Sequence, residues 1–193
     1  MIRLIEKKDY CIKTSSVPCA GKGLFCKKDI PAGTVLSYNT IVKKYSDLDD
    51  DEDHTYFMAI SYKELDKEKT MRKFITDGNP KLFKSTHLSS SAFVNEASLH
   101  PPNCVFVTNP IITKESIIEA YTFKTKLVSS LLLVPFDLKK GTELFTMYGS
   151  GYNSRGYKQW RDRNGFRDNL IEESHRIVNE NVDELKILLL NNN

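Results

Sequence analysis

Short runs of strand-forming residues alternate with turn signals along residues 10–44, and this alternation constrains the fold more than any other feature of the sequence. Glycine and proline mark the turns in Ala20–Gly23 and Ile30–Gly33. Beside these turns lie the β-type runs Cys11–Thr14 and Thr34–Tyr38. Turns of this kind between such runs are typical of hairpins. The N-terminal part of the chain is therefore predicted to consist of short, hairpin-connected strands.

Length and composition indicate one globular domain. The chain has 193 residues, of which 40% are hydrophobic and 27% are charged, as expected for a protein with one core. The longest apolar runs are far shorter than the roughly 18 residues that a membrane span needs. Charged residues appear before any apolar stretch that could serve as a secretory signal. We therefore expect an intracellular protein, nuclear or cytoplasmic, without a membrane partner; a viral or bacterial source is compatible with this expectation.

Four cysteines, Cys11, Cys19, Cys26 and Cys104, include no C-x-x-C pair. In a chain without a secretory signal they are expected to be reduced thiols. A zinc site built from the first three and a histidine is the alternative, although closed zinc sites usually take two ligands from one tight turn. We therefore expect no metal, and a zinc-dependent interaction domain is the weaker hypothesis.

The net charge is small but unevenly distributed. It is +3 in total, with +6 in residues 1–44, −3 in residues 45–154 and zero in residues 155–193. So mild an excess does not indicate direct nucleic-acid binding. The acidic run Asp47–Asp53 is by default a solvated loop. Its functional alternative is the attraction of a basic peptide.

The remainder of the chain adds helices and further strands. Residues 45–85 look like an insertion, which is polar at first and then partly helical by the spacing of its apolar residues. The runs Ile117–Thr122 and Leu127–Phe136 are predicted strands. In Asp168–Leu190 apolar residues recur every three or four positions, which predicts an amphipathic helix. Its apolar face either caps the core, which is the commoner arrangement, or forms a homodimer contact.

Three segments in one order along the chain carry a family resemblance. Gly21–Phe25 followed by Asp29–Thr34 is similar to a G-x-G-L-F … I-x-x-G-x hairpin. Phe93–Cys104 is similar to F-x-N-H-S … P-N-C, and Lys140–Gly149 is similar to G-E-E-L-x-x-x-Y-G. Each motif is weak alone, but all three in this order are specific. Together they resemble the SET-domain family of protein lysine methyltransferases.

The resemblance implies a mainly β (α+β) SET fold. This fold has small curved sheets, knot-like threading near the C-terminal end, a helical insertion and a C-terminal amphipathic helix. Residues 1–152 would form the SET domain, with the insertion at about 45–85, and residues 153–193 would be a closing segment and helix. No cysteine follows Cys104. The zinc-binding segments that flank many histone methyltransferases are therefore missing, as in the stand-alone viral, bacterial and protist members.

The first two motifs bind S-adenosyl-L-methionine in the family, so the resemblance implies this cofactor here. Glycine lets the main chain approach a ligand closely. Asn95 both donates and accepts, and its alternative role is to hold a loop. The family has a histidine after this asparagine, which binds largely through its backbone, whereas this chain has Glu96. Core packing is an equal alternative for Trp160. The predicted cofactor-binding residues are Lys22, Gly23, Leu24, Asn95, Glu96 and Trp160.

The third motif supplies the predicted catalytic residue. By resemblance, Tyr148 places its hydroxyl where the methyl group is transferred to a neutral lysine amine. Aromatic walls suit the lysine stem and its ammonium, and the predicted substrate channel comprises Tyr38, Tyr152 and Phe145. Ser150 stands where many relatives have an aromatic residue that often sets the number of methyl groups. Mono-, di- and trimethylation therefore all stay open.

Together these residues predict an S-adenosylmethionine-dependent protein lysine N-methyltransferase. Its expected substrate is a lysine-rich protein or peptide, with a histone tail as the leading candidate. Glu96, Thr142 and Met147 stand at motif positions, where Glu96 and Thr142 replace the histidine and glutamate of the quoted motifs. These departures motivate the alternative of a non-catalytic SET-like protein that binds a basic peptide or the cofactor without turnover.

Overall fold

The computed structural model describes residues 1–49, 56–60, 73–84, 90–97, 100–148 and 166–191. Most of its elements are short strands. The elements are β1 (Arg3–Leu4), β2 (Tyr10–Thr14), β3 (Lys22–Cys26), β4 (Thr34–Lys44), β5 (Phe57–Ala59), β6 (Phe74–Asp77), β7 (Asn95–Glu96), β8 (Val105–Thr108), α1 (Lys114–Phe123), β9 (Lys126–Val134), β10 (Phe145–Thr146), α3 (Phe166–Glu180) and α4 (Val182–Leu190). The predicted mainly β fold is confirmed. Within the described ranges, no helix has the length and apolar character to cross a bilayer.

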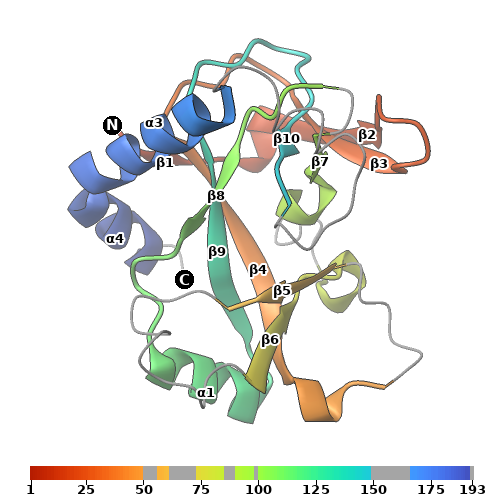
Figure 1. The fold of residues 1–193 in the computed structure, drawn as a ribbon, viewed down its shortest axis with the longest axis vertical. Helices are drawn as coiled ribbons and strands as arrows, with labels where there is room; N and C mark the ends of the chain where they lie inside the picture. The colour runs from red at the N-terminus through yellow and green to blue at the C-terminus, as the bar shows by residue number, and fades with distance from the viewer. Residues whose placement is uncertain (50–55, 61–72, 85–89, 98–99, 149–165, 192–193) are drawn as a thin grey trace. The chain divides into compact units, whose positions relative to one another are not determined.

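The strands form one six-stranded sheet and two small two-stranded sheets (Figure 1). The order in the large sheet is β5-β6-β4-β9-β8, and β1 pairs in parallel with the start of β4. One small sheet is the antiparallel hairpin of β2 and β3 that the sequence predicted, in which Tyr10 lies opposite Cys26 and Thr14 opposite Lys22. The hairpin turn contains Gly21, whose φ of +71° is a left-handed conformation that favours glycine.

The other small sheet pairs β7 with β10 in parallel. Asn95 lies opposite Phe145, and Glu96 lies opposite Thr146. Parallel neighbours need a long connection, and here β8, α1 and β9 all intervene along the chain. The pair therefore brings the second and third sequence motifs side by side. The predicted knot-like threading depends on residues 149–165, which lie outside the described residues.

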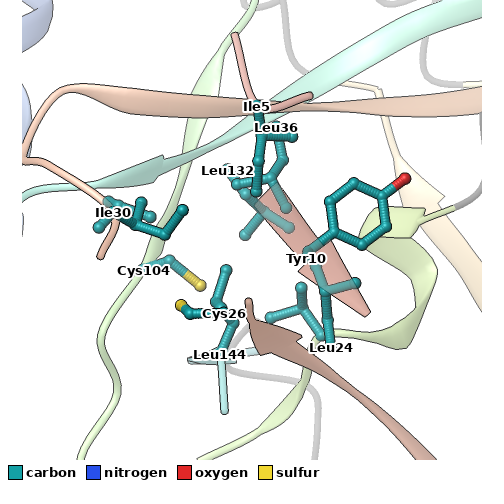
Figure 2. Close-up of a cluster of buried hydrophobic side chains, with 11 residues drawn as sticks. Ile5, Tyr10, Leu24, Cys26, Ile30, Leu36, Cys104, Leu132 and Leu144 are labelled. Carbon is teal, nitrogen blue, oxygen red and sulfur yellow. The ribbon is translucent and has the colours of Figure 1, made fainter. Parts of the chain in front are cut away.

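The chain divides into two compact units, and the first comprises residues 1–36, 93–107 and 132–193. Figure 2 shows a buried cluster of this unit, in which the sulfur atoms of Cys26 and Cys104 lie among aliphatic side chains. Burial raises the pKa of the Cys26 thiol to about 11, and it raises the pKa of Cys104 as well. Both thiols are therefore protonated core groups. The cluster consists of Ile5, Tyr10, Leu24, Cys26, Ile30, Leu36, Val94, Cys104, Leu132, Val134 and Leu144.

The second unit comprises residues 37–92 and 108–131. Within the insertion that was expected to be partly helical, β5 and β6 are antiparallel strands, so Phe57 is a strand residue and not a helical one. Residues 61–72 of the insertion lie outside the described residues. The core of this unit consists of Val42, Ile60, Phe74, Ile112, Ile117 and Ala120.

Helix α1 corrects the strand that was predicted for residues 117–122. Thr113 accepts a hydrogen bond from the Ser116 N–H, and the Ser116 hydroxyl also contacts the Thr113 N–H. This reciprocal cap satisfies the first turn of the helix. Ile117 packs in the core while Ile118 is partly exposed. The cap and the packing of one face outweigh the strand preference of these β-branched residues.

The C-terminal amphipathic helix expected over 168–190 is confirmed as a helical segment but is divided into α3 and α4. Asn181, between them, has φ −129° and ψ 22°, which is not helical. Its side chain donates to the Ile177 carbonyl at 2.8 Å and so caps the end of α3. Leu170 and Leu185 are completely buried. The predicted apolar face therefore packs within the first unit.

Asp9 is completely buried and links three segments of the first unit. Its carboxylate pairs with Arg3 and Lys28, each at 2.7 Å, and accepts from the Glu6 N–H at 3.2 Å. Burial alone would raise the pKa of Asp9, but the bonds from Lys28 and Arg3 outweigh it and hold this pKa at about 2, below the usual 3.8. A carboxyl with a lowered folded-state pKa stabilises the fold above its unfolded pKa and loses this contribution as pH falls through the folded value.

We therefore expect Asp9 to contribute about 2 kcal/mol of stability at pH 5 that disappears towards pH 2. Urea unfolding between pH 5 and pH 2 measures the loss. Asp9→Asn is the comparison, because it lacks the titrating group: its unfolding free energy should be lower at pH 5 and should fall less steeply. Equal slopes for the two proteins would contradict this assignment.

Candidate active site

Backbone hydrogen bonds join the first sequence motif to the third within the first unit. The Leu144 N–H donates to the Leu24 carbonyl, and the Cys26 N–H donates to the Thr142 carbonyl, each at 2.8 Å. The Gly141 N–H donates back to the Cys26 carbonyl, also at 2.8 Å. Strand β3 is thus fixed against the segment that leads into β10.

Asn103 joins the second motif to the third. Its amide nitrogen donates to the Glu143 carbonyl at 2.8 Å, and its amide oxygen accepts from the Phe145 N–H at 2.9 Å. The N–H groups of Asn103 and Cys104 both reach the Phe145 carbonyl. The Asn103 amide therefore hydrogen-bonds to the main chain at the start of β10 as a neighbouring peptide group would. All three motifs, which are far apart in the sequence, meet in one place.

The Glu143 carboxylate is the polar centre of this region and is only 5% exposed. It accepts hydrogen bonds from the hydroxyls of Ser15 and Ser16, each at 2.6 Å, and from the Ser16 N–H at 2.8 Å. The Asn95 amide also donates to it, at 3.3 Å. Burial raises the pKa of Glu143, but these donors outweigh burial and keep the pKa below its usual value. Glu143 is therefore ionised at neutral pH, although the described groups that donate to its carboxylate are all neutral.

Gly23 leaves the room that the Glu143 carboxylate occupies. A Cβ at residue 23 would overlap an oxygen of that carboxylate and lie 2.8 Å from its Cδ. The nearby backbone is tied down as well, because the Asn95 amide nitrogen donates to the Lys22 carbonyl at 3.1 Å. Sequence reasoning assigned the glycine to close approach by a ligand. In the structure, the close approach at this position is made by the carboxylate of Glu143.

Asn95 makes hydrogen bonds of the kind expected from its loop-holding alternative. Its amide nitrogen is shared among the Ser15 hydroxyl, the Lys22 carbonyl and Glu143. No described residue donates to its amide oxygen, which leaves an acceptor suited to a cationic or N–H group. Next to this loop, a Cβ at Gly21 would meet no atom of the described residues within 4 Å. A backbone with open space beside it and an acceptor nearby fits the amino-acid end of S-adenosylmethionine.

Residues 94–96, which include β7, hold both the main chain and the hydroxyl of Tyr148. Its N–H donates to the Glu96 carboxylate. Its hydroxyl donates to the Val94 carbonyl at 3.0 Å. Because the hydroxyl proton is committed to Val94, the Tyr148 oxygen acts towards other groups as an acceptor. This geometry suits a tyrosine that contacts an electron-poor methyl group or an amine N–H.

Phe145 and Leu24 are core residues. The Phe145 ring is buried and stacks on His100, with centroids 5.0 Å apart and planes 15° apart. His100 in turn lies 3.3 Å from the Ser16 hydroxyl. The Leu24 side chain is completely buried in the cluster of Figure 2. Only the main chain of Leu24 could therefore contact a cofactor, and the role of Phe145 in a lysine channel stays a prediction.

Tyr38 belongs to the second unit, where it is 5% exposed. Burial and the nearby Asp77 raise the pKa of its hydroxyl, so the phenol is neutral. A Cβ at Gly78 would overlap the Tyr38 ring, so this glycine gives the ring its space. The predicted residues Tyr152 and Trp160 lie outside the described residues. Their assigned roles stay predictions.

Sequence reasoning missed Ser15, Ser16, Glu143 and Asn103 as members of the site. Glu143 and Asn103 lie inside the quoted motifs, so a family pattern already pointed to their positions. Nothing in the sequence separates Ser15 and Ser16 from an ordinary polar turn. For the zinc alternative, the part of the chain that the structure describes contains no group of three Cys, His, Asp or Glu residues placed to hold a metal ion.

Comparison with known proteins gives one family match. The family model described as the SET domain matches residues 21–149, which is more than half of the chain. No curated protein matches the sequence.

Two solved structures illustrate the structural neighbours. KRYPTONITE in complex with mCHH DNA, an H3(1–15) peptide and SAH has 18% identity and a TM-score of 0.44, over 74% of this chain and 23% of that one. The methyltransferase domain of human PR domain-containing protein 2 has 15% identity and a TM-score of 0.48, over 78% of this chain and 83% of that one. This chain thus spans about a quarter of the KRYPTONITE chain.

Proposed function

Because this chain belongs to the SET-domain family, we propose that it is an S-adenosylmethionine-dependent protein lysine N-methyltransferase. The observation that carries the proposal is the meeting of the three motifs around Glu143, with Tyr148 held beside them. Backbone pairing, rather than chance proximity, holds these segments together. Membership of the SET-domain family supports the proposed reaction class, and the hydrogen-bonded geometry of the site supports the roles proposed for its residues.

The cofactor supplies an electrophilic methyl group on a sulfonium. The residues that would hold it are the main chain at Gly21 and Lys22 and the amide oxygen of Asn95. The Glu143 carboxylate fixes this cradle by binding Ser15, Ser16 and Asn95 at once. A buried anion close to the cradle also favours a cationic ligand, since charges interact strongly where water is excluded.

Methyl transfer to lysine needs a neutral amine in line with the methyl group, so the protein's task is to align, desolvate and orient. We propose that the Tyr148 oxygen accepts a contact from the amine or the methyl group, because its own proton is donated to Val94. No general base is needed at this position: a cationic ligand nearby lowers the pKa of an approaching lysine. Tyr148 is thus an orienting group, not a proton acceptor.

The proposed substrate is a lysine-rich protein or peptide, with a histone tail as the leading candidate, in the nucleus or cytoplasm. The acidic middle of the chain supports a basic substrate. Within that region Asp47 is partly engaged, since it accepts from the Tyr121 hydroxyl at 2.8 Å. The acidic residues at positions 50–53 lie outside the described residues, and for them the proposal rests on the sequence.

Isotopically labelled S-adenosylmethionine tests the proposed function directly. The purified chain is incubated with the labelled cofactor and mixed core histones, and peptide mass spectrometry locates the methyl group. We expect label on lysine side chains and in no other residue type. Equilibrium binding of the cofactor, measured by quenching of Trp160 fluorescence or by calorimetry, is determined in parallel. Cofactor binding without transfer to any lysine-rich protein would contradict the enzyme proposal.

The second candidate function is a SET-like protein that binds a basic peptide or the cofactor without turnover. Glu96 and Thr142, which stand where the quoted motifs have histidine and glutamate, favour it. The same assay separates the two candidates, because this protein would retain cofactor or peptide binding and transfer nothing.

A further inference from the structure

Glu96 is the most distinctive residue of the site, because it stands where the family motif has histidine. The side chain of the neighbouring Asn95 donates to Glu143. The Glu96 carboxylate accepts the N–H of Tyr148 instead, and the residue is only 7% exposed. The contact joins β7 to the residue that follows β10 by two positions.

From this contact we infer that Glu96 is a positioning residue that fixes the main chain of Tyr148 and thereby aims its hydroxyl. The inference rests on the proposed function, because it assigns a task within the same site. Two anchors then define Tyr148: the Glu96 carboxylate holds the N–H, and the Val94 carbonyl accepts the hydroxyl. With both ends held, the ring has little freedom to turn away.

Strand geometry explains how two adjacent residues serve different parts of the site. Successive side chains of a strand point to opposite faces. Asn95 accordingly reaches Ser15, Lys22 and Glu143, which form the cofactor cradle, while Glu96 reaches Tyr148. The two-residue strand β7 therefore couples the position of the cradle to the position of the tyrosine.

A carboxylate suits this task better than the imidazole of the family motif. A backbone N–H requires an acceptor, and a carboxylate offers acceptor sites only, whereas an imidazole accepts in one tautomer and not when protonated. A hydrogen bond to an ionised group is also shorter and stronger than one between neutral groups. Glu96 thus gives the Tyr148 N–H an acceptor that does not depend on tautomer, which assigns a role within the site to a departure that otherwise favours the non-catalytic candidate.

Three substitutions at residue 96 test the inference. Glu96→Ala removes the acceptor, Glu96→Asp keeps the charge but shortens the reach, and Glu96→Gln keeps the reach with a neutral acceptor. We expect kcat to fall about tenfold or more for Ala and Asp and within about threefold for Gln, with the cofactor KM changing less than about threefold in all three. Glu143→Gln is the matched control, since it alters the other buried carboxylate and should raise the cofactor KM.

A direct readout does not depend on turnover. In protein labelled with ¹⁵N at its nine tyrosines, the Tyr148 amide is identified by its loss in Tyr148→Phe. Its proton should resonate downfield because it is bonded to a carboxylate. Glu96→Ala should shift it upfield by more than any other tyrosine amide, Glu96→Gln should shift it part of the way, and Glu143→Gln should leave it nearly in place.

The outcomes decide the inference separately from the proposed function. An unmoved Tyr148 amide in Glu96→Ala would overturn it, as would a raised cofactor KM with unchanged kcat, which would make Glu96 a cofactor contact. If Glu96→Ala does not fold, as judged by the other tyrosine amides, two variants still test the inference. Glu96→Gln shows the effect of removing the charge, and Glu96→Asp shows the effect of shortening the side chain. A wild-type protein that binds cofactor and transfers no methyl group contradicts the proposed function, while the amide shifts still decide whether Glu96 anchors Tyr148.

Discussion

Tyr148→Phe is expected to reduce methyl transfer by about 100-fold or more while cofactor affinity changes little. The substitution removes one oxygen, which donates to the Val94 carbonyl at 3.0 Å and would orient the amine and the methyl group. The Glu96 contact uses the main-chain N–H of residue 148 and survives the change. The loss should therefore appear in kcat, as expected for an interaction made chiefly in the transition state.

Tyr121→Phe is the matched control for this experiment. It removes the same atom from a tyrosine of the second unit, whose hydroxyl donates to Asp47 at 2.8 Å. We expect its methyl transfer to match that of the wild type. Labelled cofactor and a lysine-rich protein give the rates, and calorimetry gives the cofactor affinity. Full activity of Tyr148→Phe would remove Tyr148 from the site.

Local signals in the sequence were sufficient for the hairpin and the general class of fold. Gly21 marks the turn because its left-handed backbone conformation favours glycine, so the residue type alone indicates the turn. The α1 segment misled the prediction because Ile117 and Ile118 prefer strands, while the capping pair of Thr113 and Ser116 preceded the segment that was read. An N-cap signal read together with the apolar spacing would have favoured a helix there.

The candidate site was predictable only as far as the family motifs reach. The motifs pointed to Asn95 and Tyr148, but they did not predict which groups the two side chains bind. The Asn95 amide holds a loop because Ser15 and Lys22 lie across from it. Those neighbours are distant along the chain, so no local pattern encodes the contact. The contacts require both the parallel pairing of β7 with β10 and the backbone bonds that fix β3 against residues 141–144, and both are tertiary properties.

Gly23→Ala is expected to destabilise the fold by about 3 kcal/mol and to weaken cofactor binding at least tenfold. The added methyl group would occupy the space of the Glu143 carboxylate, whose bonds to Ser15 and Ser16 would then be strained or lost. Urea unfolding and calorimetry measure the two effects. Gly21→Ala is the matched control for stability: a Cβ there meets no described atom within 4 Å, so its unfolding free energy should fall only by the cost of its φ of +71°, about 1 kcal/mol.

A double-mutant cycle with Glu143→Ala isolates the cause. If Gly23 makes room for the carboxylate, truncating Glu143 removes the overlap, and adding Gly23→Ala to that background should cost much less than it costs in the wild type. The expected coupling between the two positions is about 2 kcal/mol. Glu143→Ala alone should still be destabilising, because Ser15, Ser16 and Asn95 lose a shared acceptor. If the losses in unfolding free energy are additive, Gly23 is needed only for its backbone conformation. If the two positions are strongly coupled, the buried Glu143 carboxylate is the reason for glycine at this position.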